Sequence, residues 1–236
     1  MDNNTNNNQN YFDFISTDLI ASKLSYLKEA LPAKPSKKNY QLTNKMLFIE
    51  GIITERNLQE KLQQVADKMR DHLLIDKYIK ILTIPTVEAG KFERIDDLNC
   101  IYINNSLDLQ SYKQKVAILA HEMSHFYLIY QHNIYFADKN ENELLTEINA
   151  IFIGFGFLLL EGYETFKSTR KNRQFMTKVG YIDIRTCKRT IVQTAYIRKQ
   201  NPTWILKNIH FRDIPYFGFQ LLNLIIAYYK AKKAQH

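Results

Sequence analysis

Cysteine is scarce in this chain of 236 residues: only Cys100 and Cys187 occur, and they form no CxxC pair. Neither a disulfide framework nor a zinc site built from thiolates is expected, because both need several cysteines at short spacings. Two cysteines without a disulfide framework are typical of a protein in a reducing compartment. The composition, 45% hydrophobic and 13% aromatic, is rich enough for a full core, which excludes a disordered or fibrous protein.

A signal peptide is also missing from the first residues, MDNNTNNNQNYFDF, which have neither a basic nor an apolar segment. Two apolar runs, 148–160 with 13 residues and 214–229 with 16, are shorter than the roughly 20 residues of a membrane-spanning helix. The sequence therefore predicts core helices, no spanning segment and a cytoplasmic protein. A membrane-associated protein is an alternative in which both runs would lie in lipid.

Positive charge is concentrated in one part of the chain, whose net charge is +8 overall. Residues 165–212 contain twelve Lys or Arg and one acid, a net charge of +11, whereas residues 1–164 contain 17 basic and 22 acidic residues, a net charge of −5. Such a basic region attracts nucleic acid, acidic lipid or an acidic protein. Because no nucleic-acid-binding motif is visible, solvated helix faces explain the charges more simply, and nucleic acid is an alternative partner only.

Hydrophobic spacing divides the chain into helices and one strand-rich segment. Residues 1–10 form an Asn-rich tail that is too polar to fold and is expected to be disordered. Helices are expected at 20–31 and 55–75, where apolar residues recur every three or four positions. Short β-branched runs between 77 and 108 predict a small sheet. Further helices are expected after Asp183 and at 213–232, so the fold class is α+β and mostly helical.

The stretch HEMSH, residues 121–125, lies within a predicted helix that follows a predicted strand. Residues four apart share a helix face, so His121 and His125 can direct their imidazoles at one ion while Glu122 projects beside them. Catalytic zinc usually has three protein ligands and one water, and it lowers the pKa of that water to about 7. Glu122 would then be the general base of a hydrolysis reaction. Manganese, cobalt or iron would suit the same side chains.

A third ligand must come from another part of the chain. Leu128 and Gln131 stand where the metzincin pattern has glycine and histidine, which excludes that pattern. Glu143 and Glu147 lie one helical turn apart in the phrase NENELLTEINA. The residues alone leave open which of these two carboxylates is the ligand.

HEMSH followed 18 residues later by Glu143, in the phrase NELLTE, resembles the gluzincin metallopeptidases. The thermolysin-type phrase is Asn-Glu, three residues, then Asp, and the CAAX prenyl protease type 1 group is similar. This resemblance, over residues 98–160, implies one zinc ion per chain with Glu143 as its third ligand. Glu147 stands where those families have an aspartate, which implies that it orients His121 by a hydrogen bond. Because glutamate is longer than aspartate, Glu147 as the ligand stays an alternative.

The resemblance also implies a zincin-like core with an active-site helix and an edge strand at 100–104 that pairs with an extended substrate. The expected regions are N-terminal helices at 11–76, the core at 77–165, and basic helices at 166–236 that form one compact domain with the core. A further donor is needed to stabilise the transition state. By chemistry alone the candidates are Tyr130, Tyr135, His132 and His210.

The sequence thus predicts a gluzincin-like zinc metallopeptidase that cuts a specific peptide or protein inside the cell. The alternative is a non-catalytic regulatory or binding protein on a zincin scaffold, whose basic region binds an acidic partner or nucleic acid. The two predictions differ at Glu122, because only hydrolysis depends on its carboxylate.

Overall fold

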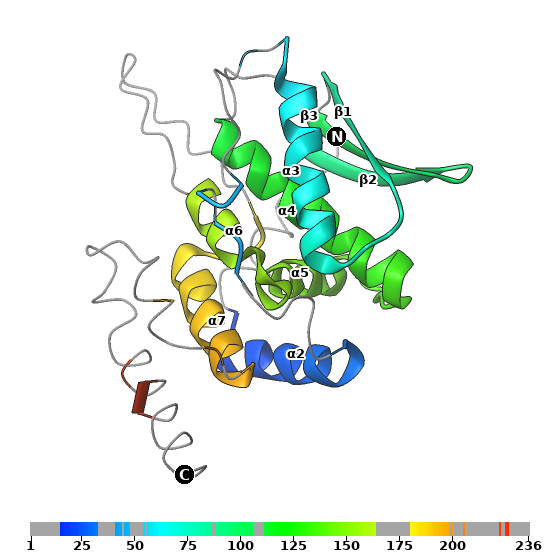
Figure 1. Ribbon diagram of the computed structural model, residues 1–236. Coiled ribbons are helices and arrows are strands. Elements are labelled where there is room, and N and C mark those ends of the chain that lie inside the picture. Colours follow the sequence, from blue (N-terminus) through cyan, green and yellow to red (C-terminus); the bar gives the residue numbers. More distant parts are fainter. Residues whose placement is uncertain are drawn as a thin grey trace, which may run out of the picture. The chain divides into compact units, whose positions relative to one another are not determined.

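Figure 1 shows the computed structural model, which describes residues 15–32, 41–43, 45–47, 54, 56–85, 88–105, 111–163, 180–198, 200, 205, 222, 225 and 226. These residues form mostly helices and one three-stranded mixed sheet, so the predicted α+β class is confirmed. They separate into two compact units: one contains α2 (Thr17–Ala30) and α7 (Ile184–Ile197), and the other lies within Lys34–Tyr181. The predicted Asn-rich tail and nearly all of the predicted last helix lie outside the described residues.

The helices α2 and α7 each begin with a side-chain cap. Ser16 accepts a hydrogen bond from the N–H of Leu19, and Asp183 accepts bonds from the N–H groups of Arg185 and Thr186. These caps satisfy N–H groups that the first turn of a helix leaves unpaired. Both helices were predicted from their apolar spacing, and both are confirmed.

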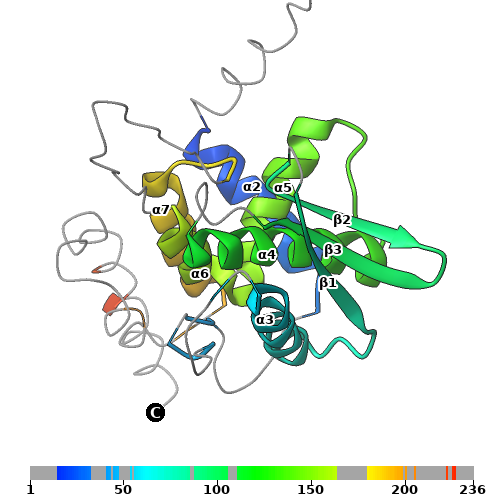
Figure 2. The ribbon, with the colours of Figure 1, turned by 90° about the horizontal axis from the view of Figure 1, so that it is seen from above.

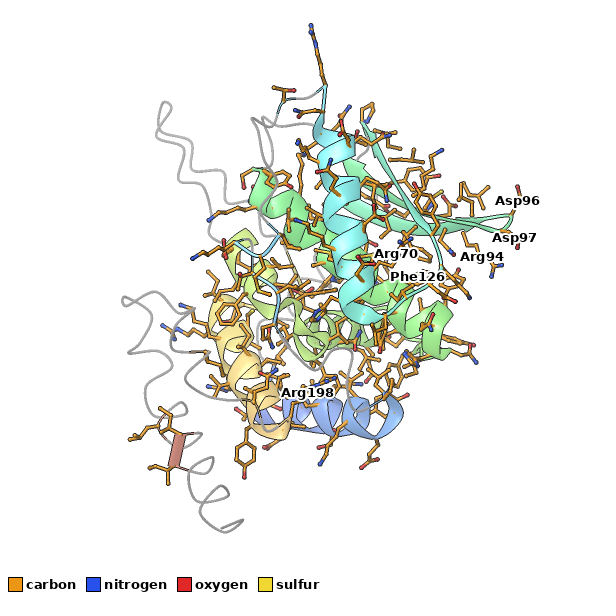
Figure 3. The ribbon with its side chains drawn as sticks, viewed as in Figure 1. Arg70, Arg94, Asp96, Asp97, Phe126 and Arg198 are labelled. Carbon is orange, nitrogen blue, oxygen red and sulfur yellow. The ribbon has the colours of Figure 1, made fainter. Side chains whose placement is uncertain are left out.

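The sheet belongs to the other unit and has the strand order β1-β3-β2. β1 (Ile79–Ile84) pairs in parallel with β3 (Leu98–Asn104), and β2 (Gly90–Ile95) pairs with β3 in the antiparallel direction. Asp96 and Asp97 form the turn between β2 and β3 and lie at the tip of this hairpin (Figure 3). The sheet predicted between 77 and 108 is therefore confirmed.

The prediction that 100–104 is an edge strand is wrong. These residues belong to β3, which has a hydrogen-bonded strand on each side. The tight hairpin places β2 on one side, and the parallel register that sets Ile79 opposite Asn99 places β1 on the other. A β-branched run can form a central or an edge strand, so its pattern does not reveal the order. β2, the other strand of this hairpin, is an edge strand of the sheet.

Two helices, α3 (Leu58–Leu73) and α4 (Tyr112–Phe126), cover one face of the sheet (Figures 1 and 2). The residues of β1 and β3 that contribute to this layer are buried and apolar: Ile79, Ile81, Ile101 and Ile103. Fully burying one such side chain contributes about 1.5–3 kcal/mol, so the layer holds α4 firmly in place. Because α3 lies in the same unit as the sheet, the predicted division at residue 76 does not separate two units.

Side chains of α3 also cover the outer edge of β1. Gln63 donates from Nε2 to the carbonyl of Ile79 at 2.9 Å and accepts at Oε1 from the N–H of Ile81 at 2.8 Å. Gln59 accepts at Oε1 from the N–H of Thr83 at 3.2 Å. Unpaired strand edges invite pairing with other chains. Within the part of the chain that the structure describes, β2 forms the other edge of the sheet, and no further strand pairs with it.

Helix α5 (Lys139–Ala150) continues through a π-helical turn, η2 (Ile151–Phe155), into α6 (Gly156–Gly162). Gly154, at φ +105°, breaks the regular backbone, and two freed carbonyls find other donors. The carbonyl of Ile153 accepts from Nε2 of His72 at 3.0 Å, and that of Gly154 accepts from the N–H of Leu42 at 2.7 Å. These bonds fix the kink that separates α5 from α6.

One helix among the described residues, Lys139–Gly162, is long and apolar enough by length and composition to cross a membrane. Within the protein, 89% of its most apolar window is buried. A core helix passes the same test, so this feature is weak evidence for a membrane location.

Candidate metal centre

The helix that carries HEMSH is fixed at its beginning. Ser111 and Gln114 form a capping box, in which each side chain accepts a bond from the other residue's N–H. Lys115 is fully buried and donates from Nζ to the carbonyl of Asn104, at the end of β3, at 2.6 Å. At its other end α4 continues into a π-helical turn, η1 (Tyr127–Gln131). These contacts hold the motif against the sheet.

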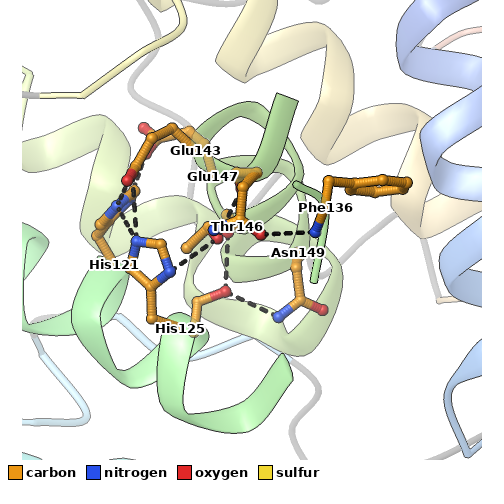
Figure 4. A network of polar contacts seen from close by, with 9 residues as sticks. His121, His125, Phe136, Glu143, Thr146, Glu147 and Asn149 are labelled. Carbon is orange, nitrogen blue, oxygen red and sulfur yellow. Dashed lines mark hydrogen bonds and ion pairs between the residues drawn. The ribbon is translucent and has the colours of Figure 1, made fainter. Parts of the chain in front are cut away.

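His121, His125 and Glu143 converge on one point between α4 and α5 (Figure 4). Nε2 of His121 lies 3.1 Å from Nε2 of His125 and 3.1 Å from Oε2 of Glu143. Nε2 of His125 lies 3.2 Å from the same oxygen of Glu143. A tetrahedral zinc ion with bonds of about 2.0–2.2 Å holds its ligand atoms roughly 3.3 Å apart. The structure therefore brings the three predicted ligands together at the spacing of a metal site.

Glu147 lies on the other side of the His121 ring. Its Oε2 accepts a hydrogen bond from Nδ1 of His121 at 2.7 Å, and its side chain is fully buried. Because Nδ1 carries this proton, a neutral His121 keeps its lone pair on Nε2, the atom that faces Glu143. The geometry thus favours Glu143 as the ligand and Glu147 as the residue that orients His121.

Thr146 orients His125 in the same way, although no sequence pattern singles it out. Oγ1 of Thr146 lies 3.1 Å from Nδ1 of His125 and 2.8 Å from the carbonyl of Asn142. A threonine hydroxyl has one proton, which goes to the carbonyl, so Oγ1 accepts from the Nδ1–H of His125. Nε2 of His125 then directs its lone pair at the same point as Nε2 of His121. The phrase NELLTE contains Thr146, but only the packing of α4 on α5 reveals its contact.

Two further hydrogen bonds join α4 to α5 (Figure 4). Nδ2 of Asn149 donates to Oγ of Ser124 at 2.7 Å, and Ser124 donates to the carbonyl of Thr146 at 2.8 Å. All three residues are fully buried, and a buried network of this kind rigidifies the elements that it joins. It holds the two ligand-bearing helices at a fixed separation.

The carboxylates beside His121 favour a positive charge at the centre of the cluster. Burial lowers the pKa of His121, but the hydrogen bonds with Glu143 and Glu147 outweigh burial and raise this pKa to about 10. Burial raises the pKa of Glu143, but both histidines outweigh it and hold this pKa well below its usual range. The cation is either a proton on His121 or a metal ion. A proton forms one good hydrogen bond, whereas a metal ion contacts all three converging atoms.

Glu122 is buried beside the two histidines. Burial raises the pKa of Glu122, and Glu143 adds to this rise, while both histidines and a hydrogen bond with the backbone of Phe92 limit it. A carboxylate with a raised pKa is a better proton acceptor near neutral pH. Gly90 lets β2 approach this carboxylate closely, because a Cβ there would collide with Ile118 and lie 3.1 Å from Oε1 of Glu122.

A cleft of about 670 Å³ is lined by the residues of the candidate centre: His121, Glu122, His125, Glu143 and Glu147. The start of β2 forms one wall, α4 and α5 contribute others, and an apolar part is lined by Ala117, Ile118, Leu159 and Tyr163. Tyr181 lines the same cleft. Its ring stacks on His121 with centroids 5.5 Å apart at 29°, and its hydroxyl is hydrogen-bonded to Glu143. Burial, followed by the charge of Glu143, raises the pKa of Tyr181.

The candidates for a transition-state donor lie elsewhere. Tyr130 stacks on Phe126, His132 meets the ring of Tyr127 edge to face, and Tyr135 is 65% exposed. These three residues do not line the cleft, and His210 lies outside the described residues. Tyr181 was missed because no spacing distinguishes it among the 15 tyrosines of the chain.

Comparison of the chain with protein-family models, with curated proteins and with solved structures gives no match. No family is therefore assigned to the chain. The features that point to a function are the HEMSH motif and the geometry of the side chains around it.

Proposed function

We propose that the chain is a zinc-dependent metallopeptidase of the gluzincin type with a zincin-like core. The observation that carries this proposal is the convergence of His121, His125 and Glu143 at metal-binding distance, with Glu122 buried beside them in a cleft. Structural zinc sites usually have four protein ligands and are closed. Three ligands that line a cleft instead leave a position for water or substrate, as catalytic sites do.

The metal proposed is one zinc ion per chain. Two imidazoles and one carboxylate are a ligand set of catalytic zinc, and their hydrogen bonds to Glu147 and Thr146 fix the imidazoles in the required orientation. When bound, zinc would lower the pKa of a water to about 7 and polarise a carbonyl group.

Glu122 is the proposed general base. It accepts a proton from the attacking water as the new C–O bond forms, and it delivers this proton to the nitrogen as the C–N bond breaks. The raised pKa of Glu122 suits both steps, because the carboxylate must hold the proton between them.

The proposed substrate is an extended segment of a peptide or protein that pairs with the edge of β2. This edge lies beside the reactive centre, because the backbone of Phe92 is hydrogen-bonded to Glu122 and Gly90 approaches the same carboxylate. Glutamines of α3 cover the opposite edge of the sheet, on β1. Pairing with an exposed strand edge is a common mode of peptide recognition. The substrate-binding strand is therefore β2 rather than the predicted 100–104.

Metal content tests the first half of this proposal. The untagged chain should contain one zinc ion by elemental mass spectrometry, and His121→Ala and Glu143→Gln should contain almost none. Glu141→Gln makes the same chemical change as Glu143→Gln on the same helix but outside the cleft, so it should keep its zinc. A wild-type chain that stays metal-free in excess zinc would disprove the site.

Hydrolysis tests the second half. The zinc-loaded chain is incubated with a peptide library, and cleavage products are read by mass spectrometry. Glu122→Gln should keep its zinc and cleave about 10³-fold more slowly. If the wild type cleaves nothing and Glu122→Gln behaves identically, the peptidase proposal fails and the regulatory-protein alternative takes its place.

A further inference from the structure

Tyr181 reaches the metal centre from a segment that is distant from the motif in the sequence. Its ring stacks on His121, and its hydroxyl is hydrogen-bonded to Glu143. The same side chain lines the cleft together with Glu122. A hydroxyl in this position lies next to the atoms that would act on a substrate.

Gly180 fixes the backbone that places Tyr181 there. Gly180 has φ +99°, which glycine adopts without strain and other residues rarely do. A Cβ on Gly180 would collide with the hydroxyl of Tyr163 and lie 2.6 Å from Oε1 of Glu147. Gly180 therefore packs directly on the carboxylate that orients His121, so the position of Tyr181 is tied to the position of a ligand.

We propose that Tyr181 is a catalytic residue, which donates a hydrogen bond to the carbonyl oxygen of the scissile peptide bond as that oxygen becomes negatively charged. This inference depends on the peptidase function proposed above. In the resting protein the hydroxyl is hydrogen-bonded to Glu143, so the substrate oxygen replaces an existing partner. Preorganised donors of this kind stabilise the transition state because they need no reorganisation during the reaction.

The reaction balances without any other reactant. The oxygen of water bonds to the carbonyl carbon, its proton passes to Glu122, and the C=O π electrons move to the carbonyl oxygen. Tyr181 donates a hydrogen bond to that oxygen and keeps its own proton. When the C–N bond breaks, the electron pair returns to form C=O, and Glu122 gives its proton to the nitrogen.

Tyr163 is the other tyrosine of the cleft, and its position does not suit this role. Its hydroxyl lies near Gly180 and Glu147, and Glu147 is bound to Nδ1 of His121. Nδ1 is on the opposite side of the imidazole from Nε2, which faces the metal centre. Tyr181 instead contacts Glu143, whose Oε2 lies at the centre itself.

Tyr181→Phe tests this role because it removes one oxygen and keeps the ring on His121. Tyr130→Phe is the matched control, since Tyr130 lies outside the cleft. With a peptide that the wild type cleaves, Tyr181→Phe should lower kcat about 10²–10³-fold. Its KM should stay within about threefold, its zinc content should stay at one per chain, and Tyr130→Phe should match the wild type in all respects.

Binding gives a readout that is independent of turnover. A phosphinic pseudopeptide imitates the tetrahedral, negatively charged state, and calorimetry should show that Tyr181→Phe binds it about 10–100-fold more weakly. The corresponding product peptide should bind equally to both proteins. The assignment is overturned if Tyr181→Phe keeps wild-type kcat, or if its lost activity follows lost zinc. A phenolate-to-copper absorption band in the Cu(II)-loaded wild type would also overturn it, because Tyr181 would then be a metal ligand.

The same measurements distinguish this inference from the function on which it depends. Cleavage by the wild type, its loss in Glu122→Gln and full activity in Tyr181→Phe would reject only the role of Tyr181. An inactive wild type would reject the peptidase function, and the role of Tyr181 with it.

Discussion

Each histidine of the proposed metal centre is held by a hydrogen bond on the side of the ring away from the metal position. Glu147 holds His121 at 2.7 Å, and Thr146 holds His125 at 3.1 Å. Partners of this kind fix the tautomer and the ring orientation, and losing one typically costs 10–100-fold in metal affinity. The two hydrogen bonds therefore direct the Nε2 lone pairs of both histidines at one point, which the residue types alone do not ensure.

Replacing Thr146 with valine should weaken zinc binding about 10–100-fold, because valine has the same shape but cannot accept the proton of His125. Competition with a chelating dye at fixed pH measures this affinity. Thr146→Ser retains the hydroxyl and should stay within about threefold of the wild type. Weakening in Thr146→Ser together with wild-type affinity in Thr146→Val would show that the methyl group of Thr146 matters and its oxygen does not.

Lys115 should make the free energy of unfolding depend on alkaline pH. Burial lowers the pKa of Lys115 from 10.5 to about 8. Between these values the unfolded chain binds more protons than the folded chain, so this residue's contribution makes stability rise from pH 8 to pH 10.5. Below pH 8 both states are protonated and the full penalty of burying the charge is present.

Urea unfolding of the wild type and of Lys115→Met across this pH range measures the effect. The stability of the wild type relative to the variant should increase by about 1–3 kcal/mol from pH 8 to pH 10. Parallel pH profiles of the two proteins would contradict the proposed ionisation of Lys115.

At the scale of elements, α3 both covers the sheet and completes the edge of β1. A strand edge normally pairs with another strand, but here the amide of Gln63 bonds to the carbonyl of Ile79 and the N–H of Ile81. The amphipathic spacing at 55–75 predicts the helix, because its apolar stripe is a local property. The contacts of the glutamines on its other positions depend on where β1 lies, which no local pattern reveals.

Gln63→Ala should lower the free energy of unfolding by about 1–3 kcal/mol, because it leaves two backbone groups of β1 without their partner. Gln64→Ala is the control, since Gln64 bonds along the helix to Glu60 and not to β1, and surface changes of this kind stay within about 0.5 kcal/mol. Chemical denaturation measures both. Equal effects of the two substitutions would refute the edge-covering role of Gln63.

At the scale of the whole molecule, the proposed metal centre belongs to one of the two compact units. Its ligands come from α4 and α5 within Lys34–Tyr181, and the unit of α2 and α7 supplies none of them. A ligand that binds only the folded state stabilises it by about 4 kcal/mol at a thousandfold excess over Kd. The benefit of zinc should therefore be concentrated in the unit that holds it.

Removing zinc with a chelator should speed amide hydrogen exchange most in α4 and α5, which the metal ion joins, and least in α2 and α7. Hydrogen exchange followed by mass spectrometry measures this segment by segment, with His121→Ala as a protein that should not respond. A uniform change throughout the chain would show that the metal does not act through the two helices.

Local patterns in the sequence are sufficient to predict the local features of this protein. The spacing of His121 and His125 places both on one helix face, and the apolar stripes predict α2, α3 and α7, because helix periodicity depends only on neighbouring residues. Tertiary structure decided that β3 is central and β2 is the edge strand. It also decided which glutamate meets the histidines, and it brought Thr146 and Tyr181 to the site. These contacts join residues that are far apart in the chain, so they depend on how the helices and strands pack.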